Sequence, residues 1–573
     1  MKSIIKSCIF LVFMAISVAA SGQKEIIHDA EYYILEAQHG EKWKAEDKGL
    51  QDKLKSLRKK YGTPPNIIHI MWDDMPVGEI GIPALQKNRG FETPVMNKVA
   101  QEGILFTRMY TEPSCTPTRA AAITGRHAVR SSMTTVAFPY EYGGIAAEEV
   151  FMAEVLSEAG YATAFYGKAH LGDVESSYLH TNGFDEALWT PYNQVPSLYV
   201  RRGQQAALYP TSMYPDMYPA DKYELDAGWR PDGFVWALEA KKGGKAKEWG
   251  STENDDDYYK IDPECVKRAK AFMAKSKDAK KPFYIAYWPM MQSFLGNQPG
   301  TPNNTTSGAP VQEGYVKVDN YVGQIMDELK RLGLEENTLV ILMADNGPMT
   351  HNGPPGFIEH LYRGGKGDFT EGAVRVPAIA KWKGVIDEGQ IVGDMIHVTD
   401  LFTTFANLAD AKQHIPTDRI IDGIDQTSLL LMGDGNGRRD YVHIYTGPIY
   451  AATVKGRFKR HWVGELPGLS GAAFYDLYND PREENGKMLP GFTTKGMFME
   501  MKIRHELWKQ KYPDRPQTRD FPFKGLENPS PKVKAASEPR IDPKDLPFDP
   551  REFIKYLDEW EDTEQLWFDD NNK

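Results

Sequence analysis

One short segment of the sequence combines residue types and spacings suited to nucleophilic chemistry. Residues 114–119 read Ser-Cys-Thr-Pro-Thr-Arg. Pro117 fits the first turn of a helix, where a missing N–H costs no hydrogen bond. Cys115 is therefore expected at the start of that helix, where free N–H groups favour an anion, with Arg119 one turn further on. The pattern predicts a thiol of depressed pKa that acts as a nucleophile; the alternative is a buried, inert cysteine.

Two pairs of oxygen-bearing side chains each follow an apolar run. Asp73 and Asp74 follow one run, and Asp345 and Asn346 follow another. In an open parallel sheet, ligands bind beyond the carboxyl ends of the strands. Three carboxylates and one amide oxygen would make a hard ligand set that suits Ca²⁺, or less well Mg²⁺, rather than Zn²⁺. Each pair taken alone has another explanation, because Asp and Asn after a strand often cap a helix or form a turn. The metal site is therefore predicted only if the two pairs meet.

The apolar runs alternate with helical patterns along the chain. Strands are predicted over residues 66–72, 161–166, 283–288, 339–344 and 376–382. Helices are predicted over residues 96–102, 149–159, 263–277 and 315–332. This alternation predicts an α/β fold, with a large, mainly parallel or mixed sheet sandwiched by helices.

The composition changes along the chain and indicates four regions. They are a signal peptide at 1–22, a polar, helix-prone lead-in at 23–62, a catalytic α/β domain at 63–440, and a smaller C-terminal α+β subdomain with an extended tail at 441–573. Residues 176–260 interrupt the alternation and are rich in Tyr, Trp, Met and Pro. We interpret them as an insertion near the mouth of the site, which either covers the sheet or contacts substrate.

The first 22 residues have the features of a cleavable secretory signal. A lysine-containing start precedes an apolar run over residues 8–18 and small residues at 19–22. The run is too short to span a membrane comfortably, and no later stretch reaches spanning length. The sequence therefore predicts a periplasmic or secreted protein with no membrane span after the signal is removed.

Export would leave two of the three cysteines, Cys115 and Cys265. Two cysteines in an exported protein can form a disulfide. Their contexts differ, however, because Cys115 lies in a proline-rich turn and Cys265 in a helical pattern. We predict that Cys265 is a free thiol on a helix.

The charge of the chain limits its partners. The formal net charge is −11, and no dominant basic face is indicated, which argues against nucleic acid as the main partner. A small anionic substrate remains compatible with this charge, because lysine and arginine can gather locally in an acidic protein.

The segment from Cys115 to Arg126 resembles the Cys-x-Pro-x-Arg signature of the formylglycine-dependent sulfatases, the type I or arylsulfatase-like members of the alkaline phosphatase superfamily. Further segments resemble other motifs of that family in the same order. They are residues 66–74 (first metal-binding strand), 167–172 (Gly-Lys-Ala-His-Leu-Gly, with Ala169 where the family has Trp), 345–347 (Asp-Asn-Gly), 363–377 (late lysine motif) and 474–481. The matches cover roughly residues 65–485, and their collinearity is more specific than any single motif.

The resemblance implies a sulfatase that hydrolyses a sulfated saccharide or an aryl sulfate. It implies that a formylglycine-generating maturation enzyme oxidises Cys115 to an aldehyde whose hydrate is the nucleophile. The catalytic residues that it implies are Cys115, Arg119, Lys168, His170 and Lys366, and the metal ligands are Asp73, Asp74, Asp345 and Asn346. Lys168 and Lys366 would act on the sulfate oxygens, and His170 would accept a proton during release of sulfate.

The sequence departs from the family in one place. Family members commonly carry a histidine after the strand at 283–288, where it helps to protonate the leaving oxygen, but residues 289–294 read Pro-Met-Met-Gln-Ser-Phe. Gln292, Ser293, His351 and His360 are the candidates for that position or role. Without a replacement acid, substrates with good leaving groups would be favoured. A phosphonate monoester or phosphodiester hydrolase, and a catalytically weak glycan-binding relative, are the alternatives.

Overall fold

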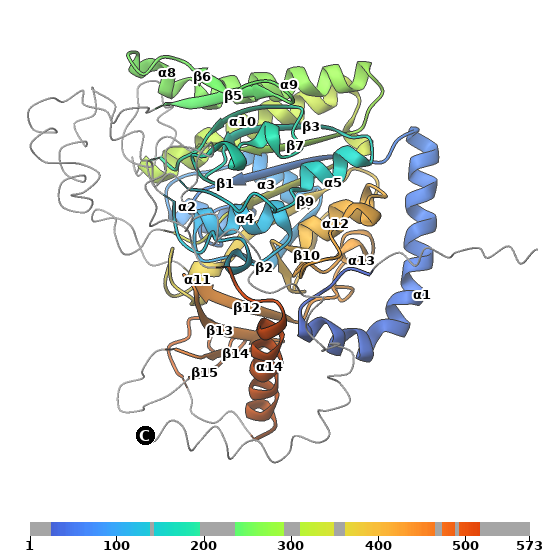
Figure 1. Ribbon diagram of the computed structural model, residues 1–573, viewed down its shortest axis with the longest axis vertical. Helices are drawn as coiled ribbons and strands as arrows, with labels where there is room; N and C mark the ends of the chain where they lie inside the picture. The colour runs from blue at the N-terminus through green and yellow to red at the C-terminus, as the bar shows by residue number, and fades with distance from the viewer. Residues whose placement is uncertain are drawn as a thin grey trace, which may run out of the picture.

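The computed structural model describes residues 25–137, 143–194, 235–290, 310–348, 361–463, 473–486 and 492–515. A mixed sheet lies at its centre (Figure 1). Its strands are β1 (Asn66–Trp72), β2 (Ile104–Tyr110), β3 (Ala162–Lys168), β4 (Glu186–Thr190), β5 (Ala237–Lys241), β6 (Lys247–Trp249), β7 (Phe283–Trp288), β8 (Thr338–Ala344), β9 (Arg375–Lys381), β10 (Gln390–Val392) and β11 (Ile396–His397). The strand order is β10-β2-β9-β8-β1-β7-β3-β4-β5-β6, and β11 also pairs with β2.

Helices cover the sheet in two groups. One group is α3 (Pro94–Gln101), α9 (Ile261–Asp278) and α10 (Pro310–Leu332); the other is α4 (Cys115–Thr124), α5 (Met152–Glu158) and α12 (Asp400–Leu408). Within each group the helices pack on one another, with α9 on β3 and β7 and α12 on α4 and α5. The shorter helices are α2 (Pro83–Asn88), α8 (Asp255–Tyr259), α11 (Glu371–Val374) and α13 (Thr427–Met432). The predicted α/β sandwich is confirmed.

The four central strands β8, β1, β7 and β3 are parallel, so their carboxyl ends meet at one edge. Every residue of β1, β7 and β8 is buried, as expected for apolar runs covered on both faces. Trp72 pairs with Ala344 at the ends of β1 and β8. This register places the residues that follow the two strands side by side.

The five predicted strands correspond to β1, β3, β7, β8 and β9. β2 is not among them, because Thr107 and Arg108 interrupt its apolar run and the register shifts there against β9. The described parts of the predicted insertion at 176–260 do not stand apart from the sheet, since β4, β5 and β6 extend it. Residues 195–234, like the predicted signal peptide, lie outside the described residues.

A small antiparallel sheet forms the C-terminal subdomain, at the opposite end of the molecule from β5 and β6 (Figure 1). It comprises β12 (Tyr441–Thr446), β13 (Ile449–Lys455), β14 (Phe458–His461) and β15 (Phe474–Asp476), and α14 (Phe492–Lys511) follows it. The predicted lead-in is the helix α1 (Ala30–Tyr61), which runs along one side of the molecule and contacts α14. Both predicted elements are therefore present.

Two further expectations concern the membrane and the cysteines. Among the described residues, no helix has both the length and the apolar character needed to cross a membrane. Cys115 and Cys265 are both free and buried, and Cys265 lies on α9. The prediction that Cys265 is a free thiol on a helix is confirmed.

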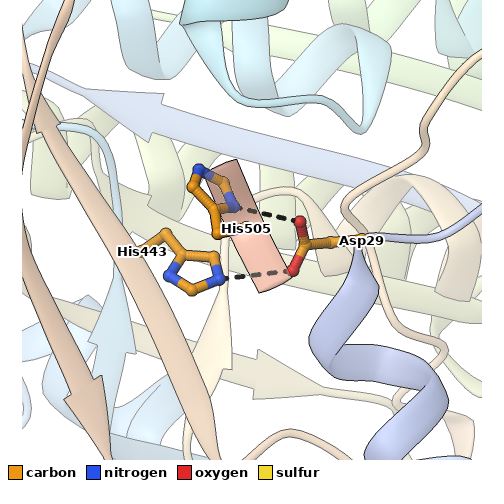
Figure 2. Close-up of side chains that lie close together, drawn as sticks. All are labelled: Asp29, His443 and His505. Atoms are coloured by element: carbon orange, nitrogen blue, oxygen red, sulfur yellow. Dashed lines mark hydrogen bonds and ion pairs between the residues drawn. The ribbon is translucent and has the colours of Figure 1, made fainter. Parts of the chain in front are cut away.

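A buried carboxylate joins α1 to the C-terminal subdomain. One Asp29 oxygen lies 3.2 Å from Nε2 of His443, and the other lies 3.2 Å from Nδ1 of His505 (Figure 2). The hydroxyl groups of Tyr450 and Tyr445 contact the remaining ring nitrogens of His443 and His505. Each imidazole can therefore accept from a tyrosine and donate to Asp29, so these hydrogen bonds satisfy the cluster without a metal ion. Burial would raise the pKa of Asp29, but the two histidines hold it well below its usual range.

We expect Asp29→Asn to destabilise the protein by about 2 kcal/mol, because an amide offers only one acceptor oxygen to two buried imidazoles. Urea unfolding at pH 7 measures the loss. Since the pKa of folded Asp29 is depressed, its contribution is present above the unfolded pKa of about 3.8 and is lost as the pH falls further. The difference between wild type and variant should therefore shrink below about pH 4. The control Glu41→Gln, on the exposed face of α1, should leave the urea midpoint of unfolding unchanged. A urea midpoint of Asp29→Asn equal to that of wild type at pH 7 would contradict the prediction.

Candidate active site

The acids that follow β1 and β8 meet the start of α4 at the carboxyl edge of the sheet. Asp73, Asp74, Cys115 and Asp345 each present one potential ligand atom within 4.8 Å of the others, and all four are buried. The backbone N–H of Asp74 donates to Asp345 Oδ1 at 3.1 Å. Cys115 is the first residue of α4, as the position of Pro117 predicts. The structure thus brings together groups that are far apart in sequence.

Arg119 is completely buried and joins three of these segments. Its Nε and NH2 donate to Asp345 Oδ2 at 3.1 and 2.8 Å, and its NH2 lies 3.3 Å from Asp73 Oδ1. Its NH1 donates to the carbonyl of Lys168 at 2.8 Å. The guanidinium also lies over the ring of Trp288, with its carbon 5.3 Å from the centroid. Arg119 therefore fixes the acids directly and the end of β3 through its backbone.

Lys168, the last residue of β3, is bound to Asp73. Its Nζ lies 2.6 and 2.7 Å from the two carboxylate oxygens. Gln194 completes this group, because its Nε2 donates to Asp73 and, at 2.8 Å, to the carbonyl of Met290. Gln194 was not predicted as a site residue; no motif surrounds it, and only the placement of its segment near the site mouth pointed towards it.

Lys366 contacts both Cys115, the predicted nucleophile, and Asp74, one of the predicted metal ligands. Its Nζ lies 2.6 Å from Cys115 Sγ and 2.8 Å from Asp74 Oδ1. Burial would lower the pKa of Lys366, but Asp74 and Cys115 raise it well above the usual value. Lys366 is therefore a fixed cation beside the sulfur atom.

His170 is buried near enough to Lys168, Arg119 and Asp73 for their charges to act on its ring. Its Nε2 donates to the carbonyl of Ala137 at 2.6 Å, which leaves Nδ1 as the acceptor nitrogen. Nδ1 is buried and has no hydrogen-bond partner in the described part of the chain. The backbone of His170 is left-handed, with φ of 54°. Burial, together with the charge of Lys168, holds the pKa of His170 well below its usual range, which favours the neutral form of the ring.

The pKa values of the three carboxyl groups are shifted in different directions. Burial opposes ionisation of Asp73, but Lys168, Lys366 and Arg119 hold its pKa well below the usual range. Burial and the charge of Asp73 raise the pKa of Asp345 to about 7. Burial likewise raises the pKa of Asp74. A bound divalent cation would lower the pKa of Asp74 and of Asp345 and so favour their ionised forms.

Asn346 gives a further indication of a cation at this position. Its Nδ2 donates to Asp74 Oδ1 and to the carbonyl of Gly347, both at 2.7 Å. Its Oδ1 is buried and has no partner within the described chain. An unsatisfied amide oxygen beside three carboxylates fits a hard cation.

The pKa of the Cys115 thiol was predicted with the wrong sign. Burial, followed by the charge of Asp73, raises it to about 12, and Lys168 and Lys366 only partly oppose this rise. The start of α4 and the nearby cations had led to the expectation of a depressed pKa. The main cause of the difference is burial of the thiol, and the charge that adds to it belongs to Asp73, which follows the distant strand β1.

Gln292 and Ser293, the candidates for the position of the missing histidine, lie outside the described residues, and so do His351 and His360, the candidates for its role as an acid.

Comparison with known proteins identifies close similarities over most of the chain. The family model described as Sulfatase matches residues 65–411. Steryl-sulfatase of Rattus norvegicus is 30% identical over 471 residues, covering 74% of this chain and 79% of the relative. The crystal structure of PsFucS1 sulfatase from Pseudoalteromonas sp. has 30% identity and a TM-score of 0.68, covering 82% of this chain and 95% of that one. The structure of BT4656 with its substrate D-glucosamine-2-N,6-O-disulfate, at 17% identity and a TM-score of 0.51 over 78% of this chain and 98% of that one, shares the fold.

We expect unmodified Cys115 to resist alkylation in the native, metal-free protein. With a pKa of about 12, roughly one thiol in 10,000 is ionised at pH 8. Protein made without a maturation enzyme should remain unlabelled by iodoacetamide at Cys115, as judged by mass spectrometry. The same protein in urea should react at both Cys115 and Cys265. Rapid labelling of Cys115 in the folded protein would contradict the raised pKa.

Proposed function

We propose that this chain, which belongs to the sulfatase family, removes sulfate from a sulfated saccharide with a nucleophile made from Cys115. As a member of that family the chain is a sulfuric ester hydrolase. One observation carries the assignment of the site: Cys115 and acids from two separate strands present their ligand atoms within 4.8 Å of one another.

The nucleophile is a formylglycine, produced from Cys115 by a maturation enzyme. Burial raises the pKa of the Cys115 thiol in the metal-free chain and so makes the thiol a poor nucleophile, which supports its conversion to a different functional group. The hydrate of the formylglycine aldehyde supplies an oxygen nucleophile at the same place. Its location at the first residue of α4 favours developing negative charge, because free backbone N–H groups lie there.

The cation is held by Asp73, Asp74, Asp345 and Asn346. All four side chains are buried and offer oxygen atoms. We favour Ca²⁺ over Mg²⁺, since Mg²⁺ usually retains several water molecules, whereas this set supplies many protein oxygens. When bound, such a cation polarises a sulfate oxygen and lowers the pKa of a coordinated hydroxyl group.

The surrounding side chains bind the sulfate group and move a proton. Lys168 and Lys366 are buried or nearly so and present fixed positive charge to sulfate oxygens, whose charge changes as the S–O bond breaks. Nδ1 of His170 accepts the proton that is lost when the modified Cys115 returns to the aldehyde. Arg119 orients the acids and offsets their charge.

The substrate class is a sulfated saccharide. BT4656, which shares the fold, binds a sulfated glucosamine. The sequence of residues 176–260, which include Gln194, is rich in aromatic residues, the side-chain type that packs on sugar rings. Residues 1–22 direct export, and the enzyme acts in the periplasm or outside the cell. An aryl sulfate is the alternative substrate.

We expect Cys115→Ala to abolish turnover while preserving the fold. The matured enzyme should hydrolyse 4-nitrophenyl sulfate and members of a panel of sulfated saccharides. The kcat of the variant should be lower by at least about a thousandfold, because the variant has lost its covalent nucleophile. Circular dichroism provides the check on folding, and Cys265→Ala is the matched control. Wild-type activity in Cys115→Ala would reject the mechanism, and so would an unmodified thiol at Cys115 in the active protein.

We also expect calcium to stabilise the wild-type protein and to restore activity after treatment with EDTA. Binding to the folded state raises the thermal midpoint with increasing calcium concentration. Asp74→Asn should weaken this response strongly, because it removes charge from the ligand set. The control Asp387→Asn, which removes a carboxylate from an exposed turn, should leave the calcium response unchanged. Equal calcium responses in wild type and Asp74→Asn would contradict the proposed ligand set.

A further inference from the structure

Lys366 is carried by a loop that is closed at its base. We refer to residues 363–372 as the Lys366 loop. The carbonyl of Arg363 accepts hydrogen bonds from Gly372 N and from Thr370 Oγ1, both at 2.8 Å, so the two ends of the loop lie together. The base also packs tightly on the chain after β8: a Cβ atom on Gly347 would lie 1.7 Å from the carbonyl oxygen of Gly372. The position of this base therefore determines where Lys366 can reach.

The tip of the Lys366 loop is bound to the catalytic centre. The backbone N–H of Lys366 donates to Pro348 O at 2.9 Å, and that of Gly367 donates to Pro113 O at 2.7 Å. Lys366 Nζ then reaches Cys115 Sγ and Asp74. A shift of the base would move this ammonium group relative to both.

A single residue of the C-terminal subdomain holds both ends of the loop. Glu483 follows β15, and its main-chain carbonyl accepts from Arg363 NH1 at 2.8 Å. Its carboxylate Oε2 accepts from the backbone N–H of Glu371 at 2.5 Å. Glu483 is fully buried and has a left-handed backbone, with φ of 56°, so its conformation is set by these surroundings.

Buried charges from the small sheet fix the Glu483 carboxylate. Lys459 Nζ lies 3.0 Å from Glu483 Oε1 and 3.1 Å from Glu371 Oε1, and all three side chains are fully buried. Burial opposes the charge of Lys459, but the two glutamates raise its pKa. His461 Nε2 lies 2.7 Å from Glu483 Oε1, and burial lowers the pKa of His461, so the ring is neutral. The hydroxyl group of Tyr110 donates to the other carboxylate oxygen of Glu371, Oε2, at 2.9 Å.

We propose that Glu483 is a positioning residue for catalysis, which acts through the Lys366 loop to hold the Lys366 ammonium group against the nucleophile and the sulfate. The inference rests on the proposed function of Lys366. The C-terminal subdomain would then take part in the reaction, because Lys459 and His461 of β14 orient the Glu483 carboxylate that holds the Lys366 loop. In Glu483→Gln, one of the two acceptor oxygens is replaced by an amide nitrogen, which donates. At least one of the donors that now bind the carboxylate would therefore lose its acceptor.

A double-substitution cycle on the matured full-length enzyme tests this role. The steady-state constants of Glu483→Gln, Lys366→Ala and the double variant are measured with 4-nitrophenyl sulfate and with the sulfated saccharide that the wild type cleaves fastest. Glu483→Gln should lower kcat/KM about tenfold in the wild-type background, but less than about twofold when Lys366 is already alanine. The loss should fall mainly on kcat. Glu484→Gln is the matched control, because this neighbouring side chain is exposed and pairs only with Arg482 at the surface in the described contacts; its kcat/KM should equal that of wild type.

Equal losses in the two backgrounds would show that Glu483 only stabilises the fold and would overturn the inference. An unchanged kcat/KM in Glu483→Gln would do the same. If Glu483→Gln does not fold, Arg363→Met takes its place, since Arg363 is exposed and its substitution removes the other bond of the clamp. Wild-type enzyme that turns over none of the sulfate esters would reject the proposed function, and this inference with it.

Discussion

Three buried carboxylates and three buried or nearly buried cations hold the active centre together. Each charge would be costly in this environment without a partner, so each acid fixes the position of a basic group from a different part of the chain. Asp73 binds Lys168 at the end of β3, Asp345 binds Arg119 on α4, and Asp74 binds Lys366. The parallel alignment of β1 and β8 makes this possible, because it sets the acids that follow the two strands side by side.

The sequence was sufficient to predict the central strands and the residues at their ends. Apolar runs such as β1 and β8 form strands wherever they are covered on both faces, and the acids that follow them are visible in the sequence itself. The direction of the Cys115 pKa shift could not be predicted, because it depends first on burial of the thiol and then on the charge of Asp73, and only tertiary folding produces both. Gln194 and Glu483 had no local signal either, since each acts through contacts with distant backbone or side chains.

The small C-terminal sheet was predicted from its pattern of short strands, but the pattern does not show what the sheet does. Its opposite faces have separate roles. His443 of β12 takes part in the Asp29 cluster, which joins both ends of the described chain (Figure 2). Lys459 and His461 of β14 instead face the base of the Lys366 loop. The subdomain and the large sheet therefore share charged contacts and are expected to unfold together.

The enclosure of Cys115 has a consequence for the order of events during biosynthesis. The sulfur atom is fully buried, and the groups that enclose it include Lys366, which is translated some time after Cys115. The contacts that seat Lys366 depend in turn on Glu483, which emerges later still. A nascent or translocating chain therefore exposes the cysteine before its cover exists. The maturation enzyme that we propose would have to reach Cys115 in that interval, because folding then closes access to this position.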